Sequence, residues 1–125
     1  AAQTRLQKRV DQQLFLHGIS FTEFTVLRTL SLAPESTLRR IDLAQQIGLT
    51  ASGITRLIAP MERNNLVTKQ ANARDARVSL VKLTATGEQI LQDATASFKL
   101  AAHSIFDNLP LKDLDAIGLA IAKLK

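Results

Sequence analysis

Two short amphipathic segments joined by a glycine-containing turn constrain this chain more than any other feature. Each segment carries apolar side chains at helical spacing, on one face only. These residues are Ile41, Ala44 and Ile47, with Leu43 beside them, in the first segment, and Ile54, Leu57, Ile58 and Met61 in the second. Gly48 is suited to close the first helix, and Thr50 to cap the second. Two short helices with such a turn predict a helix-turn-helix.

The second helix of this pair is predicted to span Thr50–Arg63. Pro60 lies inside it, and because proline lacks an N–H and crowds the preceding turn, we expect a kink or a loosened last turn there. Asn64 and Asn65 tolerate a left-handed conformation and are predicted to end the helix.

The periodicity then changes to that of β-strands. Leu66–Gln70 and Arg77–Leu83 are rich in Val, Leu, Thr and Ser, whereas Ala71–Ala76 between them is small and polar. This pattern predicts a hairpin with a long loop. A hairpin directly after a helix-turn-helix is a wing.

Amphipathic helices are predicted on both sides of this motif: Thr4–Leu16, Phe21–Leu32, about 22 residues after Thr84, and a last helix from Pro110 to the C-terminus. The fold class is therefore mainly α: a winged helix-turn-helix in residues 34–83, with terminal helical regions in 1–33 and 84–125 of a single domain, 1–125. Their exposed apolar stripes favour dimerisation through a second copy of the chain. The alternative is that these helices fold back into a monomeric core.

The positive charge of the chain is confined to its middle. The net charge is +5, and the segment Thr37–Lys82 holds eight basic and three acidic residues, so this segment carries the whole excess. A localised positive field suits a polyanion, most commonly nucleic acid. The alternative from charge alone is a basic surface that only confers solubility.

Most catalytic chemistry lacks candidate residues in this sequence. There is no cysteine, and the two histidines, His17 and His103, are 86 positions apart. Metal-ligand spacings, phosphate-binding glycine loops and a nucleophile elbow are also absent. We therefore expect no enzyme, no cofactor and no metal. No apolar run approaches the roughly 20 residues of a membrane span, so no membrane partner is expected. The lack of cysteine is in keeping with a reducing, cytoplasmic location, which is the location we expect.

Double-stranded DNA is the partner that assigns a role to the outer face of helix Thr50–Arg63. Small and polar residues there allow close approach to a groove and can donate to phosphates or bases. Arginines at the hairpin tip can enter a minor groove, and the acidic residue between them is expected to hold the loop rigid by pairing with an arginine or a backbone N–H. The predicted DNA contacts are Arg40, Ala51, Ser52, Thr55, Arg56, Arg74 and Arg77, and the loop-bracing residue is Asp75. Arg56 has an alternative role, pairing with Glu62 or Asp42.

Several short motifs along the whole chain resemble the MarR family of bacterial transcription regulators. They are Asp42-Leu43-Ala44, Leu49-Thr50-Ala51-Ser52-Gly53-Ile54-Thr55-Arg56-Leu57, Met61-Glu62, Leu66-Val67, Arg74-Asp75-Ala76-Arg77 and Leu83-Thr84-Ala85-Thr86-Gly87. The resemblance implies a homodimer joined by its terminal helices that binds pseudo-palindromic operators, usually as a repressor. It adds Thr50 to the major-groove contacts and makes Arg77 the wing arginine.

Two positions depart from the family pattern: Ala76 replaces a frequent second arginine, and Asn65 replaces a usual glycine. The resemblance also implies release by a small aromatic or phenolic effector, for which no residue is assigned. The alternative function is a winged-helix module that binds an acidic protein. Salt-dependent binding to duplex DNA would distinguish the two.

Overall fold

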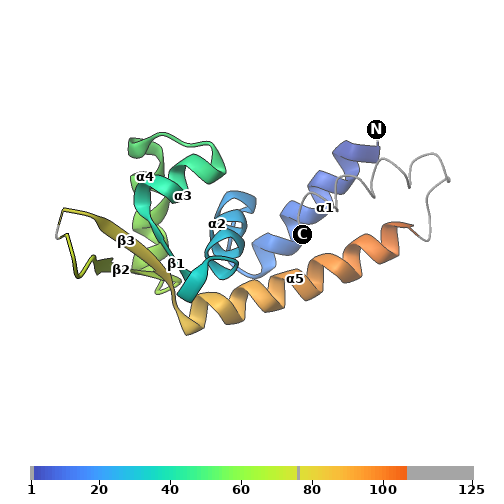
Figure 1. Ribbon diagram of the computed structural model, residues 1–125. Helices are drawn as coiled ribbons and strands as arrows, with labels where there is room; N and C mark the ends of the chain where they lie inside the picture. The colour runs from blue at the N-terminus through green and yellow to red at the C-terminus, as the bar shows by residue number, and fades with distance from the viewer. Residues whose placement is uncertain (1, 76, 107–125) are drawn as a thin grey trace. The chain divides into compact units, whose positions relative to one another are not determined.

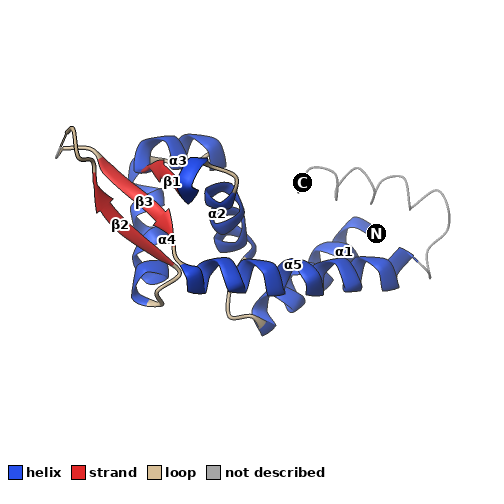
Figure 2. Cartoon of the chain, turned by 60° about the horizontal axis from the view of Figure 1, so that its bottom comes forward, coloured by secondary structure: helices blue, strands red, loops and turns tan. Residues whose placement is uncertain are grey.

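The computed structural model describes residues 2–75 and 77–106, which form helices and one small antiparallel sheet (Figures 1 and 2). In chain order, the elements are α1 (Ala2–Leu16), α2 (Phe21–Ser31), the 3-10 turn η1 (Pro34–Ser36), β1 (Thr37–Arg39), α3 (Arg40–Ile47), α4 (Ala51–Arg63), β2 (Val67–Ala71), β3 (Ser79–Leu83) and α5 (Ala85–Phe106). The chain divides into two compact units. One is Phe21–Gln92, and the other combines the described residues of Ala1–Ser20 and Asp93–Lys125.

The unit Phe21–Gln92 contains the winged helix-turn-helix that the sequence predicts in residues 34–83, and it also includes α2, which the sequence assigns to the N-terminal helical region. Gly48 adopts a left-handed conformation at the end of α3, with φ of 75°, and lets the chain turn directly into α4. Apolar side chains of α2, α3, α4 and the sheet form the core of this unit. Its fully buried members are Val26, Leu27, Leu30, Leu43, Ile54, Ile58, Met61, Val67 and Val81.

The sheet has three strands in the order β1-β3-β2, both pairs antiparallel (Figure 2). The hairpin of β2 and β3 is the predicted wing, with Val67 opposite Leu83 and Ala71 opposite Ser79. The third strand, β1, was not predicted, because a three-residue segment shows no alternation of its own. It forms by backbone pairing, which places Leu38 opposite Val81.

The wing strands are displaced from their predicted bounds. β3 begins at Ser79 rather than Arg77, and β2 begins at Val67 rather than Leu66. Arg77 and Val78 lie outside the strand because their backbone N–H groups donate to Asp75, to its carboxylate and its carbonyl respectively. Those donors are therefore used within the loop and not in the β-ladder.

One expectation about the helix pair is wrong, and another is wrong in part. Ile41 was placed on the buried stripe of α3 but is 68% exposed, whereas Leu43 is fully buried. The buried side of α3 is centred on Leu43 and Ala44, so Ile41, two residues before Leu43, falls on the other side of this short helix. Of the two outcomes expected at Pro60, a kink or a loosened last turn, the loosened turn is not seen, since α4 continues to Arg63 and the Asn64 N–H donates to the Pro60 carbonyl. Asn65 has a positive φ of 60°, as expected for the residue that replaces a glycine.

The helices outside the motif agree with the sequence where the structure describes them. α1 and α2 match their predicted segments within two residues, and α5 has the expected 22 residues. In the unit that holds α1, the side chains of Val10, Leu14 and Phe98 are buried. None of the described helices is both long and apolar enough to cross a membrane. The predicted helix after Pro110 lies outside the described residues.

Candidate nucleic-acid interface

The N-terminal part of α4 presents an exposed polar face. Thr50, Ala51, Ser52, Thr55 and Arg56 are all exposed, while the opposite side of the same helix is buried in the core. The Thr50 hydroxyl accepts a hydrogen bond of 3.0 Å from the Gly53 N–H and so caps the helix. The structure thus places five of the predicted contact residues together on one surface.

Arg40 lies behind this face and links α3 to α4. Its side chain is only 18% exposed. Its Nη1 donates to the Thr55 hydroxyl at 3.2 Å, and its Nη2 lies 3.7 Å from a Glu62 carboxylate oxygen. That second distance allows an ion pair but not a hydrogen bond, so Nη2 is buried without a hydrogen-bond partner among residues 2–75 and 77–106. In the unbound chain, Arg40 therefore connects the two helices.

The hydroxyl of Thr55 is engaged on both sides. It accepts from Arg40 and donates to the Ala51 carbonyl oxygen at 3.0 Å. Because a hydroxyl has a single hydrogen, Thr55 has no donor left for a base or a phosphate in this arrangement. The Ser52 hydroxyl oxygen lies 3.3 Å from that of Thr50, and either group can be the donor in this contact. Ser52 is therefore less committed to partners within the chain than Thr55.

The wing loop is braced by two side chains. The carboxylate of Asp75 accepts from the Arg77 backbone N–H at 3.0 Å, from Arg77 Nε at 3.2 Å and from Nη2 at 3.4 Å. Asn72 Oδ1 accepts from the backbone N–H groups of Arg74 and Asp75. Sequence reasoning missed Asn72, although an asparagine that bonds the backbone two residues on is a known turn signal.

The hydrogen bonds of the wing loop favour the charged form of Asp75, and they leave the side chains of Arg74 and Arg77 exposed. Hydrogen bonds from the Arg77 side chain, and secondly from its backbone N–H, hold the pKa of Asp75 below its ordinary value. The side chain of Arg77 is nevertheless 91% exposed, and Arg74 is exposed as well. Both arginines can therefore approach another molecule.

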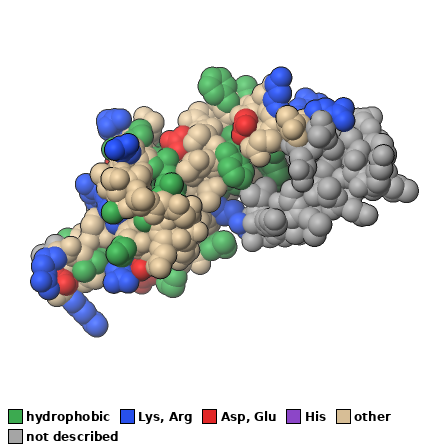
Figure 3. Space-filling view, turned by 90° about the horizontal axis from the view of Figure 1, so that it is seen from above, with side chains coloured by type: hydrophobic (Ala, Val, Ile, Leu, Met, Phe, Trp, Pro, Cys, Tyr) green, Lys and Arg blue, Asp and Glu red, His purple; other side chains and the backbone are tan. Residues whose placement is uncertain are grey.

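The ion pairs identify which cations carry the excess charge. Each of the three acidic residues in Thr37–Lys82 pairs with one arginine: Asp42 with Arg39, Glu62 with Arg40, and Asp75 with Arg77. The other five cations have no ion-pair partner among the described residues. They are Arg56, Arg63, Lys69, Arg74 and Lys82. Lys and Arg side chains gather at the hairpin end of this unit, on the left of Figure 3.

Comparisons with known proteins agree on one family. Residues 17–78 match the model of the MarR family. HTH-type transcriptional regulator PrsX of Escherichia coli is 26% identical over 108 residues, which cover 86% of this chain. The chain spans 65% of the length of that relative.

Solved structures of the family have the same fold. Sco3205, a MarR family transcriptional regulator from Streptomyces coelicolor solved in complex with DNA, is 25% identical with a TM-score of 0.78, over 98% of this chain and 78% of that one. AbsC, also a MarR family regulator from Streptomyces coelicolor, is 22% identical with a TM-score of 0.78, over 98% of this chain and 84% of that one. Wild-type MarR from E. coli is 18% identical with a TM-score of 0.79, over 98% and 90%. The last two similarities concern the fold alone.

Proposed function

Because this chain belongs to the MarR family of transcriptional regulators, we propose that it binds double-stranded DNA in a sequence-specific manner and regulates transcription. The observation that carries this proposal is the exposed N-terminal face of α4 in the same unit as a braced wing whose two arginines, Arg74 and Arg77, are exposed. α4 enters the major groove, and the wing, which carries Arg74 and Arg77, lies at the flanking minor groove, where these arginines contact the groove or the phosphates at its edge. The chain carries no catalytic chemistry in this proposal, as its named relatives are transcription regulators.

The proposal includes a homodimer that acts in the cytoplasm as a repressor at pseudo-palindromic operators. Three large apolar side chains of one unit, Phe15, Leu16 and Leu100, are at least 73% exposed, and a second copy of the chain would cover such a surface. Twofold symmetry of the protein then matches two half-sites about one helical turn apart. A small aromatic or phenolic effector would release the DNA by changing the spacing of the two α4 helices.

The proposal is tested by selecting bound duplexes from a random DNA pool and measuring their affinity at several salt concentrations. We expect two related half-sites, with centres about 10 base pairs apart or a multiple of this. The logarithm of the affinity should fall linearly with that of the salt concentration, by about 0.9 for each phosphate contact. No binding to any duplex in dilute buffer would contradict DNA recognition and favour the acidic protein partner.

The wing makes a separate prediction. Replacing Arg77 with alanine should weaken binding to the selected duplex about tenfold, because a groove or phosphate contact by arginine is lost. Arg77→Lys retains the positive charge but cannot donate to the Asp75 carboxylate through two side-chain nitrogens. Its loss of affinity should therefore be smaller than that of Arg77→Ala. Fluorescence anisotropy gives the affinities, and circular dichroism shows whether the fold is intact. An Arg77→Ala variant that is folded and binds like the wild type would remove the wing from the interface.

A further inference from the structure

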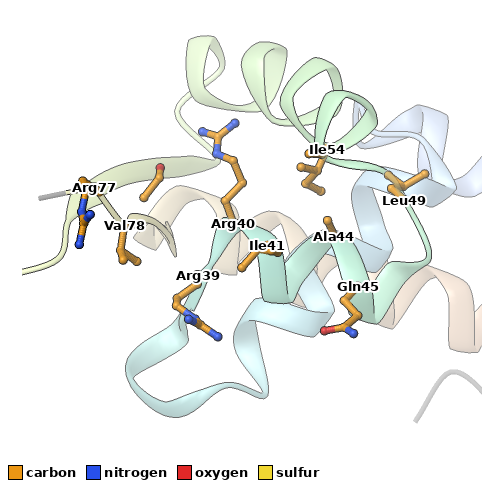
Figure 4. Close-up of a pocket in the computed structure, with 11 residues that line it drawn as sticks. Arg39, Arg40, Ile41, Ala44, Gln45, Leu49, Ile54, Arg77 and Val78 are labelled. Carbon is orange, nitrogen blue, oxygen red and sulfur yellow. The ribbon is translucent and has the colours of Figure 1, made fainter. Parts of the chain in front are cut away.

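A hollow of about 600 Å³ lies between the helix-turn-helix and the loop end of the wing (Figure 4). Its lining includes Arg39, Ile41, Leu49, Ile54, Arg77 and Val78. In Figure 4, Arg77 and Val78 stand on one side and Leu49 and Ile54 on the other, with Ile41 between them. The centre of the hollow is apolar, and Ile41, which is 68% exposed, lies there.

This hollow joins the two halves of the candidate interface. Ala51, on the exposed face of α4, and Arg77, in the wing, both line it. If α4 occupies a major groove and the wing the next minor groove, one sugar–phosphate strand separates those grooves. The surface between α4 and the wing must then face that strand.

We propose that this hollow is the seat of the sugar–phosphate strand that runs between the two grooves, an inference that rests on the proposed function. Arg39 and Arg77 donate to its phosphates, and the exposed Ser79 beside them offers a further hydroxyl donor. The apolar side chains of Ile41 and Val78 pack against the carbon atoms of deoxyribose. Arg39, Ile41 and Ser79 are contacts that the sequence did not indicate.

The ion pairs of the two arginines fit this role. Asp42 accepts from Arg39 Nε at 2.8 Å and from Nη2 at 3.1 Å. A guanidinium has five N–H donors, so three of those on Arg39 stay available for a phosphate. The carboxylates of Asp42 and Asp75 thus orient the two guanidinium groups before DNA arrives, which lowers the entropy lost on binding.

The first test compares two arginine variants that remove the same charge. Arg39→Ala should lower the salt slope of duplex binding by about 0.9, the loss of one phosphate contact, and weaken binding about tenfold. Arg63→Ala should change neither, because Arg63 is exposed at the far end of α4, about 18 Å along the helix from Ala51. The double variant Arg39→Ala/Asp42→Asn has the net charge of the wild type and should still show the lowered slope. A restored slope would mean that overall charge, and not this seat, determines the effect.

The second test places a charge in the centre of the hollow. Ile41→Glu should bind duplex DNA about tenfold more weakly than Ile41→Gln, because the carboxylate repels the phosphates. Both variants should fold, since Ile41 is exposed. Replacing single phosphates of the selected duplex by uncharged methylphosphonates should weaken wild-type binding at one position of each half-site. At that position, the same methylphosphonate should weaken DNA binding by the Arg39→Ala variant very little, because this variant already lacks the arginine that contacts the phosphate.

The outcomes separate this inference from the proposed function. If the wild type ignores every duplex, both fall together. If the wild type binds with a steep salt dependence but Arg39→Ala and Ile41→Glu match it, DNA recognition stands and the seat is wrong. In that case the hollow serves another ligand or none.

Discussion

Replacing Arg56 with glutamate is expected to weaken binding to duplex DNA about a hundredfold or more. Arg56 is exposed on α4, one turn after Ser52, and it has no ion-pair partner among the described residues. Its alternative role, pairing with Glu62 or Asp42, is not observed, because those carboxylates pair with Arg40 and Arg39. An arginine contact to a base or phosphate is worth about 1–3 kcal/mol, and the carboxylate adds repulsion to this loss.

The control for this substitution lies on the same helix. Arg63→Glu makes the same change in net charge at the last residue of α4. It should weaken binding by no more than about threefold, through the long-range field alone. Anisotropy titrations at one fixed salt concentration compare the two variants directly. Equal losses of affinity in the two variants would show that only the total charge of the protein affects DNA binding. The exposed face of α4 would then have no special role.

The sequence predicted the parts of the fold that repeat a local pattern over many residues. The stripe of Ile54, Ile58 and Met61 sets the buried face of α4, and Gly48 ends α3 with the left-handed conformation that glycine allows. β1 escaped prediction because its three residues are held by pairing with β3, which is distant in sequence. The exposure of Ile41 escaped for a similar reason, since an eight-residue helix gives too few turns to define its buried face.

The contacts of the candidate site also fall into two groups, those that follow from local spacing and those that depend on the packing of separate elements. Sequence spacing brought Ser52, Thr55 and Arg56 to one surface, because they lie on one helix. The partners across elements were not accessible from spacing: Arg40 reaches Thr55 and Glu62 on the next helix, and Arg39 and Arg77 line one hollow from strand β1 and from the wing loop. Such contacts depend on how α3, α4 and the wing pack together, which no local pattern encodes.

The start of α5 is packed unusually closely against the turn between α4 and β2. The Thr84 hydroxyl accepts from the Gly87 N–H at 2.9 Å and lies within hydrogen-bond distance of two carbonyl oxygens, those of Asn65 and Leu66. The Thr84 N–H also donates to the Leu66 carbonyl at 3.2 Å. The fixed turn, stabilised by Thr84, brings the Leu66 carbonyl against the Cα of Gly87, where a Cβ would overlap it. This explains the spacing Leu83-Thr84-Ala85-Thr86-Gly87 in physical terms.

Gly87→Ala should therefore destabilise the fold by about 3 kcal/mol, at the upper end of the cost of overpacking. The sign is the decisive part, because alanine in a helix is intrinsically favoured over glycine by about 1 kcal/mol. To relieve the overlap, the Leu66 backbone would have to move, and its carbonyl would lose the hydrogen bonds from Thr84. The free energy of unfolding in urea measures the change, with Thr86→Ala as the control in the same turn, where the exposed side chain predicts a change within about 0.5 kcal/mol. A Gly87→Ala variant more stable than the wild type would show that α5 does not approach Leu66 this closely.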